Sequence, residues 1–190
     1  MSTRRLRPAA AAVALLGATA VSPVTAQLPT YSMGRPPSAE EVKAWDLTIP
    51  ADGQGLPPGS GTAARGKPIY AERCASCHGE KGEDPKYNVL VGGRGTLATA
   101  KPLLSIGSFW PYAPTLWSYI NRAQPTDEPG SLTPDEVYAV TAYLLSLNGI
   151  VKEDEVLDAA TLPRIRMPNR DGFVPDPRPD IGPKAYRQPR

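Results

Sequence analysis

The sequence predicts an all-α fold, a small helical domain flanked by extended N- and C-terminal arms. Apolar residues recur at helical spacing in three separate segments of the 190-residue chain. Prolines and glycines, which interrupt helices, gather in the intervening and flanking segments. A chain of this length has room for one domain plus flanking segments.

We expect four parts in chain order. They are a signal peptide over residues 1–26, an extended arm over 27–61, the helical domain over 62–173 and a Pro-rich tail over 174–190. Because prolines recur through the tail, it can form neither a helix nor a central strand.

The first part has the three regions of a secretory signal. An arginine-rich start at residues 4–7 precedes a short, Ala-rich apolar run over 9–21. Small residues then place the cleavage site near Ala26/Gln27. The alternative is an anchor that stays in the membrane, but the run of about 13 residues is shorter than the roughly 20 that a spanning helix needs. We therefore expect a periplasmic protein with no membrane span in its mature form.

The charge balance excludes one class of partner. The chain has 21 basic and 19 acidic residues, and three of the arginines lie in the expected signal. The mature chain is therefore expected to be nearly neutral. Nothing in such a balance suggests binding to nucleic acid, and we expect no nucleic-acid partner.

The first two expected helices lie on either side of a Gly- and Pro-rich stretch. A short helix follows Ser38 as its N-cap, and Trp45 at its end is expected to pack onto the domain. The next helix runs from near Thr62 to about Cys74. Gly66 lies inside it, and because glycine costs about 1 kcal/mol in a helix, we expect close contact there with another helix.

A long loop separates these helices from the last two. Glycines and prolines break residues 79–113, and a loop of this length is explained if it packs on a cofactor. A further helix is expected over 114–123. The clearest helix follows Thr133, which begins a Thr-x-x-Glu capping box, and it ends before Gly149. We expect this last helix to cross the earlier one near Gly66.

The chemistry is concentrated in the segment Cys74-Ala75-Ser76-Cys77-His78. C-x-x-C-H is the attachment signature of c-type haem. Two thiols three residues apart on a helical turn can each bond one haem vinyl group, and the adjacent histidine supplies a proximal imidazole to the iron. The motif occurs once in the chain, so we expect one covalent haem c.

Other interpretations of this motif match the sequence less well. A thioredoxin-like redox pair needs a βαβ context, and none surrounds the motif. A structural zinc site needs four ligands, whereas the chain has two cysteines and one histidine. A chance match and a scaffold without haem are the remaining alternatives. The expected export signal favours haem, because attachment takes place outside the cytoplasm.

A sixth iron ligand has to be another residue type, because His78 is the only histidine. Methionine is the usual alternative and raises the reduction potential. Met167 precedes Pro168, which favours an extended backbone that can present a thioether from a loop. The alternatives are Met33, an iron left open or bound to water, and a Met167 that only packs against the domain. We therefore take His78 and Met167 as the candidate metal ligands.

The long loop also supplies candidates for the wall of a haem pocket. Arg94 lies between glycines and either bonds a haem propionate or is simply solvated. The apolar candidates are Val89, Leu90, Val91, Leu97, Leu103, Leu104, Ile106, Phe109 and Trp110.

Several features together carry a resemblance to a known family. A helix into C-x-x-C-H, a covering loop and a C-terminal amphipathic helix form the pattern of a class I c-type cytochrome. More specific segments are GLPPGSG at 55–61, VGGRGTL at 91–97, IGSFWPYA at 106–113, LNGI at 147–150 and MPNRDGF at 167–173. Through them, residues 31–177 resemble the haem subunit of bacterial sulfite dehydrogenases and Sox-type sulfane dehydrogenases.

This resemblance implies Cys74 and Cys77 as attachment sites, His78 as proximal ligand and Met167 as distal ligand. It also implies that a molybdenum-cofactor subunit oxidises a sulfur substrate, while the cytochrome passes single electrons to a soluble cytochrome c or an oxidase. Two features depart from the family. The methionine follows the last helix, so its loop must fold back. The two-haem Sox-type subunit has a second haem domain, which a single motif does not match.

Rival functions differ in what the haem does. One is a generic electron carrier for another dehydrogenase. Another, of a different class, is a haem sensor or small peroxidase with an open iron site. In the expected function the chain performs no bond chemistry of its own.

Overall fold

The structure is a computed structural model that describes residues 33–175. The expected signal peptide, the start of the N-terminal arm and nearly all of the Pro-rich tail lie outside the described residues. Contacts divide the chain into residues 1–38 and 39–190, and every helix and strand discussed here belongs to the second unit.

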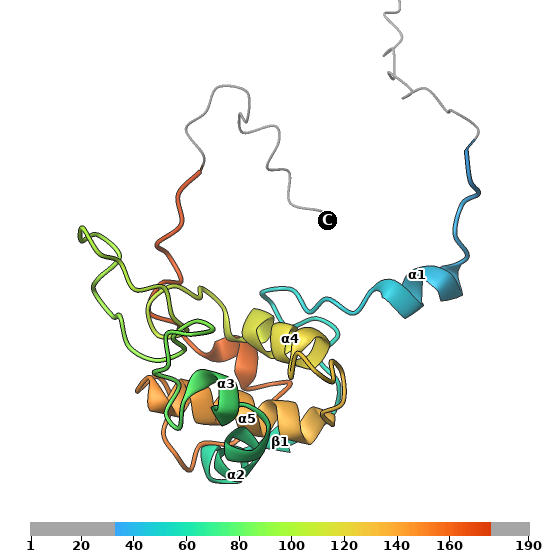
Figure 1. Cartoon of the computed structure of the whole chain (residues 1–190). Helices are drawn as coiled ribbons and strands as arrows, with labels where there is room; N and C mark the ends of the chain where they lie inside the picture. The colour runs from blue at the N-terminus through green and yellow to red at the C-terminus, as the bar shows by residue number, and fades with distance from the viewer. Residues whose placement is uncertain (1–32, 176–190) are drawn as a thin grey trace, which may run out of the picture. The chain divides into compact units, whose positions relative to one another are not determined.

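The described residues are mainly helical (Figure 1). The one sheet has two short antiparallel strands, in which Ser60 lies opposite Asp158. The elements are α1 (Ala39–Trp45), β1 (Ser60–Gly61), α2 (Ala63–Arg73), α3 (Ala75–His78), α4 (Ala113–Ala123), α5 (Pro134–Leu147), β2 (Leu157–Asp158) and the 3-10 turn η1 (Leu162–Arg164). The predicted all-α class is confirmed, and so are the predicted helices, to within a residue or two at their ends.

Helices α2 and α5 cross in direct backbone contact. A Cβ atom on Gly66 would overlap the carbonyl group of Ala139, and one on Gly61 would overlap the backbone of the same residue. One turn further along, Tyr70 is 1% exposed, and its ring centroid lies 5.3 Å from that of Tyr143. The close crossing predicted from Gly66 is therefore confirmed.

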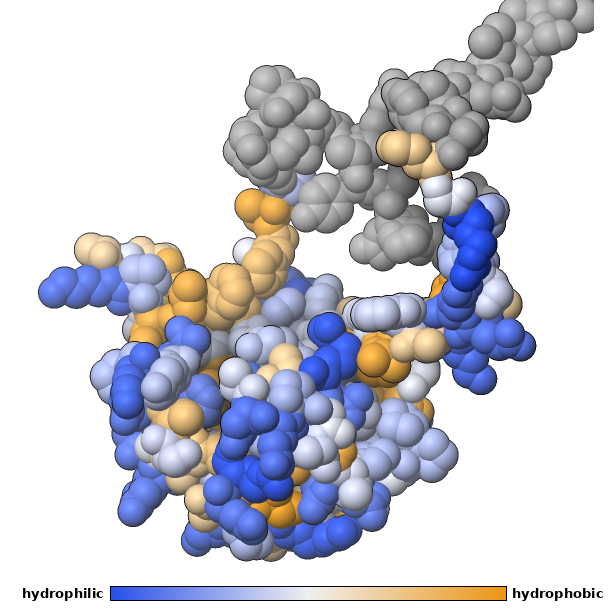
Figure 2. Space-filling view, turned by 45° about the vertical axis from the view of Figure 1, so that its right-hand side comes forward, coloured by the Kyte–Doolittle hydropathy of each residue, from blue (hydrophilic) through white to orange (hydrophobic). Residues whose placement is uncertain are grey.

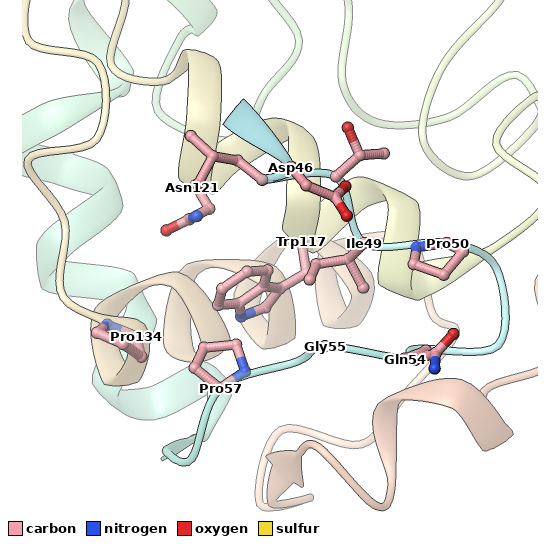
Figure 3. Close-up of a pocket in the computed structure, with 11 residues that line it drawn as sticks. Asp46, Ile49, Pro50, Gln54, Gly55, Pro57, Trp117, Asn121 and Pro134 are labelled. Carbon is pink, nitrogen blue, oxygen red and sulfur yellow. The ribbon is translucent and has the colours of Figure 1, made fainter. Parts of the chain in front are cut away.

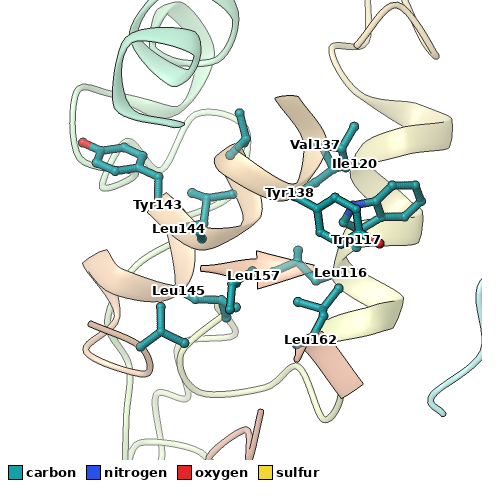
Figure 4. Packing of buried hydrophobic residues seen from close by; sticks show 14 of the residues in the cluster. Leu116, Trp117, Ile120, Val137, Tyr138, Tyr143, Leu144, Leu145, Leu157 and Leu162 are labelled. Atoms are coloured by element: carbon teal, nitrogen blue, oxygen red, sulfur yellow. The ribbon is translucent and has the colours of Figure 1, made fainter. Parts of the chain in front are cut away.

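Helix α5 is the centre of the core. All nine residues from Val137 to Leu145 are buried, as expected for a helix covered on every side. Helix α2 packs on it, α4 packs on it from another direction, and the two strands also contact it. Figure 4 shows the rings of Trp117 and Tyr138 together where α4 meets α5, and their centroids are 5.3 Å apart.

The start of α5 is fixed by the predicted capping box. The Thr133 hydroxyl accepts the Glu136 amide at 3.4 Å, and the Glu136 carboxylate accepts the Thr133 amide at 2.7 Å. Two otherwise unpaired donors at the helix end are thereby satisfied. Thr62 caps α2 in the simpler way, with its hydroxyl accepting the Arg65 amide.

The segment before β1 lies against α4 and α5. The Ile49 amide donates to the Ser118 hydroxyl at 3.0 Å, and the Tyr138 hydroxyl donates to the Pro57 carbonyl at 3.0 Å. Helix α1 behaves differently, because it has no buried residue and Trp45 is 87% exposed. The expectation that Trp45 packs onto the domain is therefore wrong. A helix of seven residues with few large apolar side chains has too small an apolar face to fix it there.

Within residues 33–175, none of the helices combines the length and the hydrophobicity needed to cross a bilayer.

Candidate haem-binding site

The C-x-x-C-H motif forms a tight turn directly after α2. Cys74 lies between α2 and α3, and its carbonyl accepts the amides of Cys77 and His78, each at 3.1 Å. The two thiols are therefore three residues apart on one turn, which places them on the same side. Both are free, with Cys77 exposed and Cys74 packed against the core.

Burial keeps the Cys74 thiol neutral. It raises the pKa of this thiol to about 11, and the effect outweighs the opposing charge of Arg73. A redox-active thiol pair needs a low-pKa thiolate as nucleophile. Cys74 therefore lacks the low-pKa thiolate that the nucleophile of a thioredoxin-like pair needs.

The imidazole of His78 is oriented by the long loop. Its Nδ1 lies 3.2 Å from the carbonyl oxygen of Asn88. When Nδ1 donates its proton to a carbonyl, the lone pair resides on Nε2, and this is the usual arrangement of a metal-bound histidine. Asn88 has φ +99°, a conformation that asparagine tolerates better than most residues. The sequence analysis missed this residue, because an acceptor on the backbone has no side-chain signature.

The predicted long loop is present, and buried hydroxyl groups hold it in place. The Ser105 hydroxyl donates to the Gly92 carbonyl and accepts the amides of Gly107 and Ser108 at 3.1 and 3.2 Å. The Ser108 hydroxyl donates to the Leu103 carbonyl at 2.6 Å. Both serines are less than 5% exposed. The loop is therefore an ordered wall of the domain, without regular secondary structure.

Met167 lies in the segment after η1 and is 1% exposed. It belongs to the apolar core cluster against which Cys74 packs. Met33, the alternative methionine, is 87% exposed. The segment after Met167 folds back onto the long loop, as predicted, because the Asn169 side-chain nitrogen donates to the Phe109 carbonyl at 2.8 Å and the Phe173 ring contacts the Phe109 ring.

A cavity of about 510 Å³ adjoins Met167. Arg94 lines it, is exposed, and donates from its guanidinium to the Asn148 carbonyl at 3.4 Å. Arg166 lines the same cavity and was not singled out from the sequence. Neither the two cysteines nor His78 is among the lining residues of this cavity.

The apolar candidates of the long loop differ in burial. Ile106 is 3% exposed, and Leu90 and Trp110 pack against the core. Leu103, Leu104 and Phe109 are 37, 55 and 37% exposed. Figure 2 shows hydrophobic side chains gathered on one part of a surface that is otherwise largely hydrophilic.

A larger cavity of about 760 Å³ lies elsewhere, between α4, the start of α5 and the segment before β1. Figure 3 shows the Trp117 indole among Ile49, Pro57 and Pro134. None of the four predicted cofactor residues lines it. We therefore do not assign it to the haem.

The residues of the motif fit haem c. Two free thiols lie on one turn beside a histidine whose Nδ1 is within hydrogen-bond distance of the Asn88 carbonyl, and a buried methionine lies in the same apolar cluster as Cys74. Among the described residues, no group of three or more His, Cys, Asp or Glu side chains offers an alternative metal site. The individual roles of Cys74, Cys77, His78 and Met167 stay predictions.

Comparison with known proteins identifies the family. The sequence profile of the family Cytochrome c matches residues 63–148. A chain in the crystal structure of the sulfane dehydrogenase SoxCD from Paracoccus pantotrophus is 41% identical, with a TM-score of 0.71, and the match covers 84% of this chain and 80% of that one.

A second relative is more distant. The thiosulfate dehydrogenase of Stutzerimonas stutzeri (strain A1501) is 33% identical over 92 residues, which is 47% of this chain and 29% of that protein. This chain therefore matches less than a third of that relative's length. The helix crossing, the C-x-x-C-H turn and these matches agree, and the chain belongs to the cytochrome c family of electron carriers that hold haem c covalently.

Proposed function

We propose that this chain is a periplasmic cytochrome with one haem, and that it carries single electrons from a molybdenum-containing sulfite or sulfane dehydrogenase subunit to a soluble cytochrome c or an oxidase. The observation that carries the proposal is the 41% identity to a chain of a sulfane dehydrogenase, over 80% of that chain. The single C-x-x-C-H motif supports one haem.

In this proposal Cys74 and Cys77 hold the haem through thioethers, His78 is the proximal ligand and Met167 the distal one. The bound group supplies reversible one-electron chemistry. The chain orients the imidazole through Asn88 and buries Met167. Burial and a methionine ligand both favour a raised reduction potential.

The electron balance sets the expected stoichiometry. Oxidation of sulfite to sulfate takes one oxygen from water and releases two electrons and two protons. A chain with one haem accepts one electron at a time, so each sulfur substrate reduces two cytochromes. Mixing the purified ferric cytochrome with the purified molybdenum subunit and sulfite tests this directly, with haem absorbance as the readout.

Two cytochromes reduced for each sulfite would support the proposed partner. A sulfane-carrying substrate is the second arm of the same assay. No reduction in either arm, together with reduction by an unrelated dehydrogenase of the same organism, would favour the generic carrier.

Attachment and location have a separate test. Periplasmic protein from a host competent in haem maturation should begin at Gln27 and carry the mass of one haem. A variant with both Cys74 and Cys77 replaced by alanine should lose that mass. A wild-type product without added mass would refute the haem assignment.

The open-site haem sensor or peroxidase is the alternative of a different class. The burial of Met167 beside a cavity favours the electron carrier over it. Ready binding of carbon monoxide by the wild-type ferrous protein would reverse that choice.

A further inference from the structure

Asn148 follows α5 and joins it to the long loop. Its side-chain oxygen accepts the Gly92 amide at 3.1 Å. Its side-chain nitrogen donates to the Leu90 carbonyl at 3.2 Å and to the Leu144 carbonyl at 2.9 Å. One amide group thus makes one bond to the end of its own helix and two to the loop.

The loop segment that Asn148 holds is the one that orients His78. Leu90 and Gly92 follow closely after Asn88, whose carbonyl oxygen lies 3.2 Å from the imidazole Nδ1. The same segment is also bonded to the residues that follow the C-x-x-C-H motif, because the Leu90 amide donates to the Gly82 carbonyl at 2.7 Å. Residues 88–92 are therefore fixed from the motif side by Gly82 and from the α5 side by Asn148.

Asn148 also borders the methionine side of the site. Its backbone carbonyl accepts the Arg94 guanidinium at 3.4 Å, and Arg94 lines the cavity beside Met167. The two residues that follow Asn148 line the same cavity. Asn148 therefore contacts the loop that bonds His78, and also Arg94, which lines the cavity beside Met167.

The three side-chain bonds of Asn148 require a carboxamide of this length. Asparagine offers one acceptor and two donors, whereas aspartate offers acceptors alone. An aspartate here would keep the bond from Gly92 and place a carboxylate against the carbonyls of Leu90 and Leu144. There is also no room for a longer side chain, because Gly107 lies against the Asn148 amide and a Cβ atom at Gly107 would overlap it.

From this geometry we propose that Asn148 is a positioning residue for the haem. It holds residues 88–92 so that the Asn88 carbonyl stays bonded to the proximal His78, and it thereby sets the reduction potential. The proposal rests on haem attachment as proposed above and is independent of the electron donor. Hydrogen bonding to a proximal histidine tunes the metal through the basicity of the imidazole.

The experiment uses the purified haem-loaded cytochrome alone. Variants Asn148→Ala, Asn148→Asp and Gly107→Ala are compared with wild type, and Asn121→Ala on α4 is the matched control. Gly107 has no left-handed backbone angle, so its substitution by alanine acts by displacing the Asn148 side chain. The measurements are the midpoint potential, and NMR hydrogen exchange of the His78 Nδ1 proton and of the Gly92 amide in the reduced protein.

We expect Asn148→Ala and Gly107→Ala to speed exchange of the His78 proton by about tenfold or more, because a segment loses protection when its hydrogen bonds are lost. Both should shift the midpoint potential in the same direction, while Asn121→Ala leaves it at the wild-type value. Asn148→Asp should keep the Gly92 amide slow but expose the His78 proton, since only the donated bonds are lost.

Two results would overturn the proposal. One is rapid exchange of the Gly92 amide in Asn148→Ala while the exchange rate of the His78 proton and the midpoint potential stay unchanged. Asn148 would then stabilise the loop without affecting the haem. The other result applies if Asn148→Ala does not fold. It is a wild-type exchange rate of the His78 proton in both Gly107→Ala and Asn148→Asp. Failure of the haem assignment would be separate and visible, because the wild-type protein would then carry no haem.

Discussion

The contact between α2 and α5 allows a test in which two physical effects have opposite signs. Replacing Gly66 with alanine inside α2 should stabilise an isolated helix by about 1 kcal/mol, because glycine is the poorer helix former. In this structure the new methyl group would overlap the Ala139 carbonyl group and approach the Val140 amide nitrogen. These are backbone atoms in the buried middle of α5, so the overlap cannot be relieved by rotating a side chain.

The expected cost follows from what must move. To admit a methyl group, the two helices must separate along a contact that also includes Tyr70, which is 1% exposed. Overpacking of this kind costs about 1–3 kcal/mol, and the upper end applies where backbone must move. After subtraction of the helix-propensity gain, we expect a net loss of about 2 kcal/mol, or a Tm about 10 °C lower for a domain of this size.

The assay is chemical denaturation of the haem-loaded protein, followed by far-UV circular dichroism. The control is Ala64→Gly on the exposed face of the same helix, which should lower stability by about 1 kcal/mol through propensity alone. If Gly66→Ala equals or exceeds wild type in stability, the packing argument is wrong.

Three further predictions concern the methionine and the capping box. In the absorption spectrum, Met167→Ala should abolish the weak far-red band of methionine-bound ferric haem, while Met33→Ala should leave this band unchanged. A wild-type spectrum without the band would exclude methionine ligation. Thr133→Ala should lower the free energy of unfolding by about 1 kcal/mol, and Thr126→Ala should not; equal effects in denaturation would contradict a capping role. Hydrogen bonds from the Thr133 amide and, to a smaller extent, from the Thr133 hydroxyl hold the pKa of the Glu136 carboxyl below its ordinary value. The stabilisation from the ionised carboxylate is therefore present above about pH 4 and is lost as the pH falls further. The difference in unfolding free energy between wild type and Glu136→Gln, which removes the ionisable carboxylate, should therefore shrink towards pH 3, and a constant difference would argue against that carboxylate as its source.

The helices could be predicted because their causes are local in sequence. Thr133 and Glu136 form the capping box within a single turn, and the apolar period after them determines which residues are buried. Gly66 also predicted a tertiary contact. Glycine destabilises a helix, and a close contact with another helix explains why it is present there. Trp45 was placed wrongly, since its hydrophobicity alone does not show whether a short helix has a partner face.

The candidate site was only partly predictable for the same reason. The spacing of the motif is local, and so Cys74, Cys77 and His78 could be named from the sequence alone. The groups that hold the imidazole are not local: the Asn88 carbonyl is a backbone atom, and Asn148 is 58 residues from its partner Leu90. Arg166 was missed in the same way, since its place at the cavity depends on how the chain returns after α5.

The long loop shows why such distant contacts are needed. Residues 79–112 contain no helix or strand, yet Ser105, Ile106 and Ser108 within them are buried. Their buried backbone groups must still be paired, because an unpaired buried amide costs about as much as a lost hydrogen bond. Ser105, Ser108 and Asn148 provide partners in place of a helix or sheet ladder. Substitutions at those three positions should therefore loosen the loop, and the His78 imidazole, which is bonded to this loop, should respond with it.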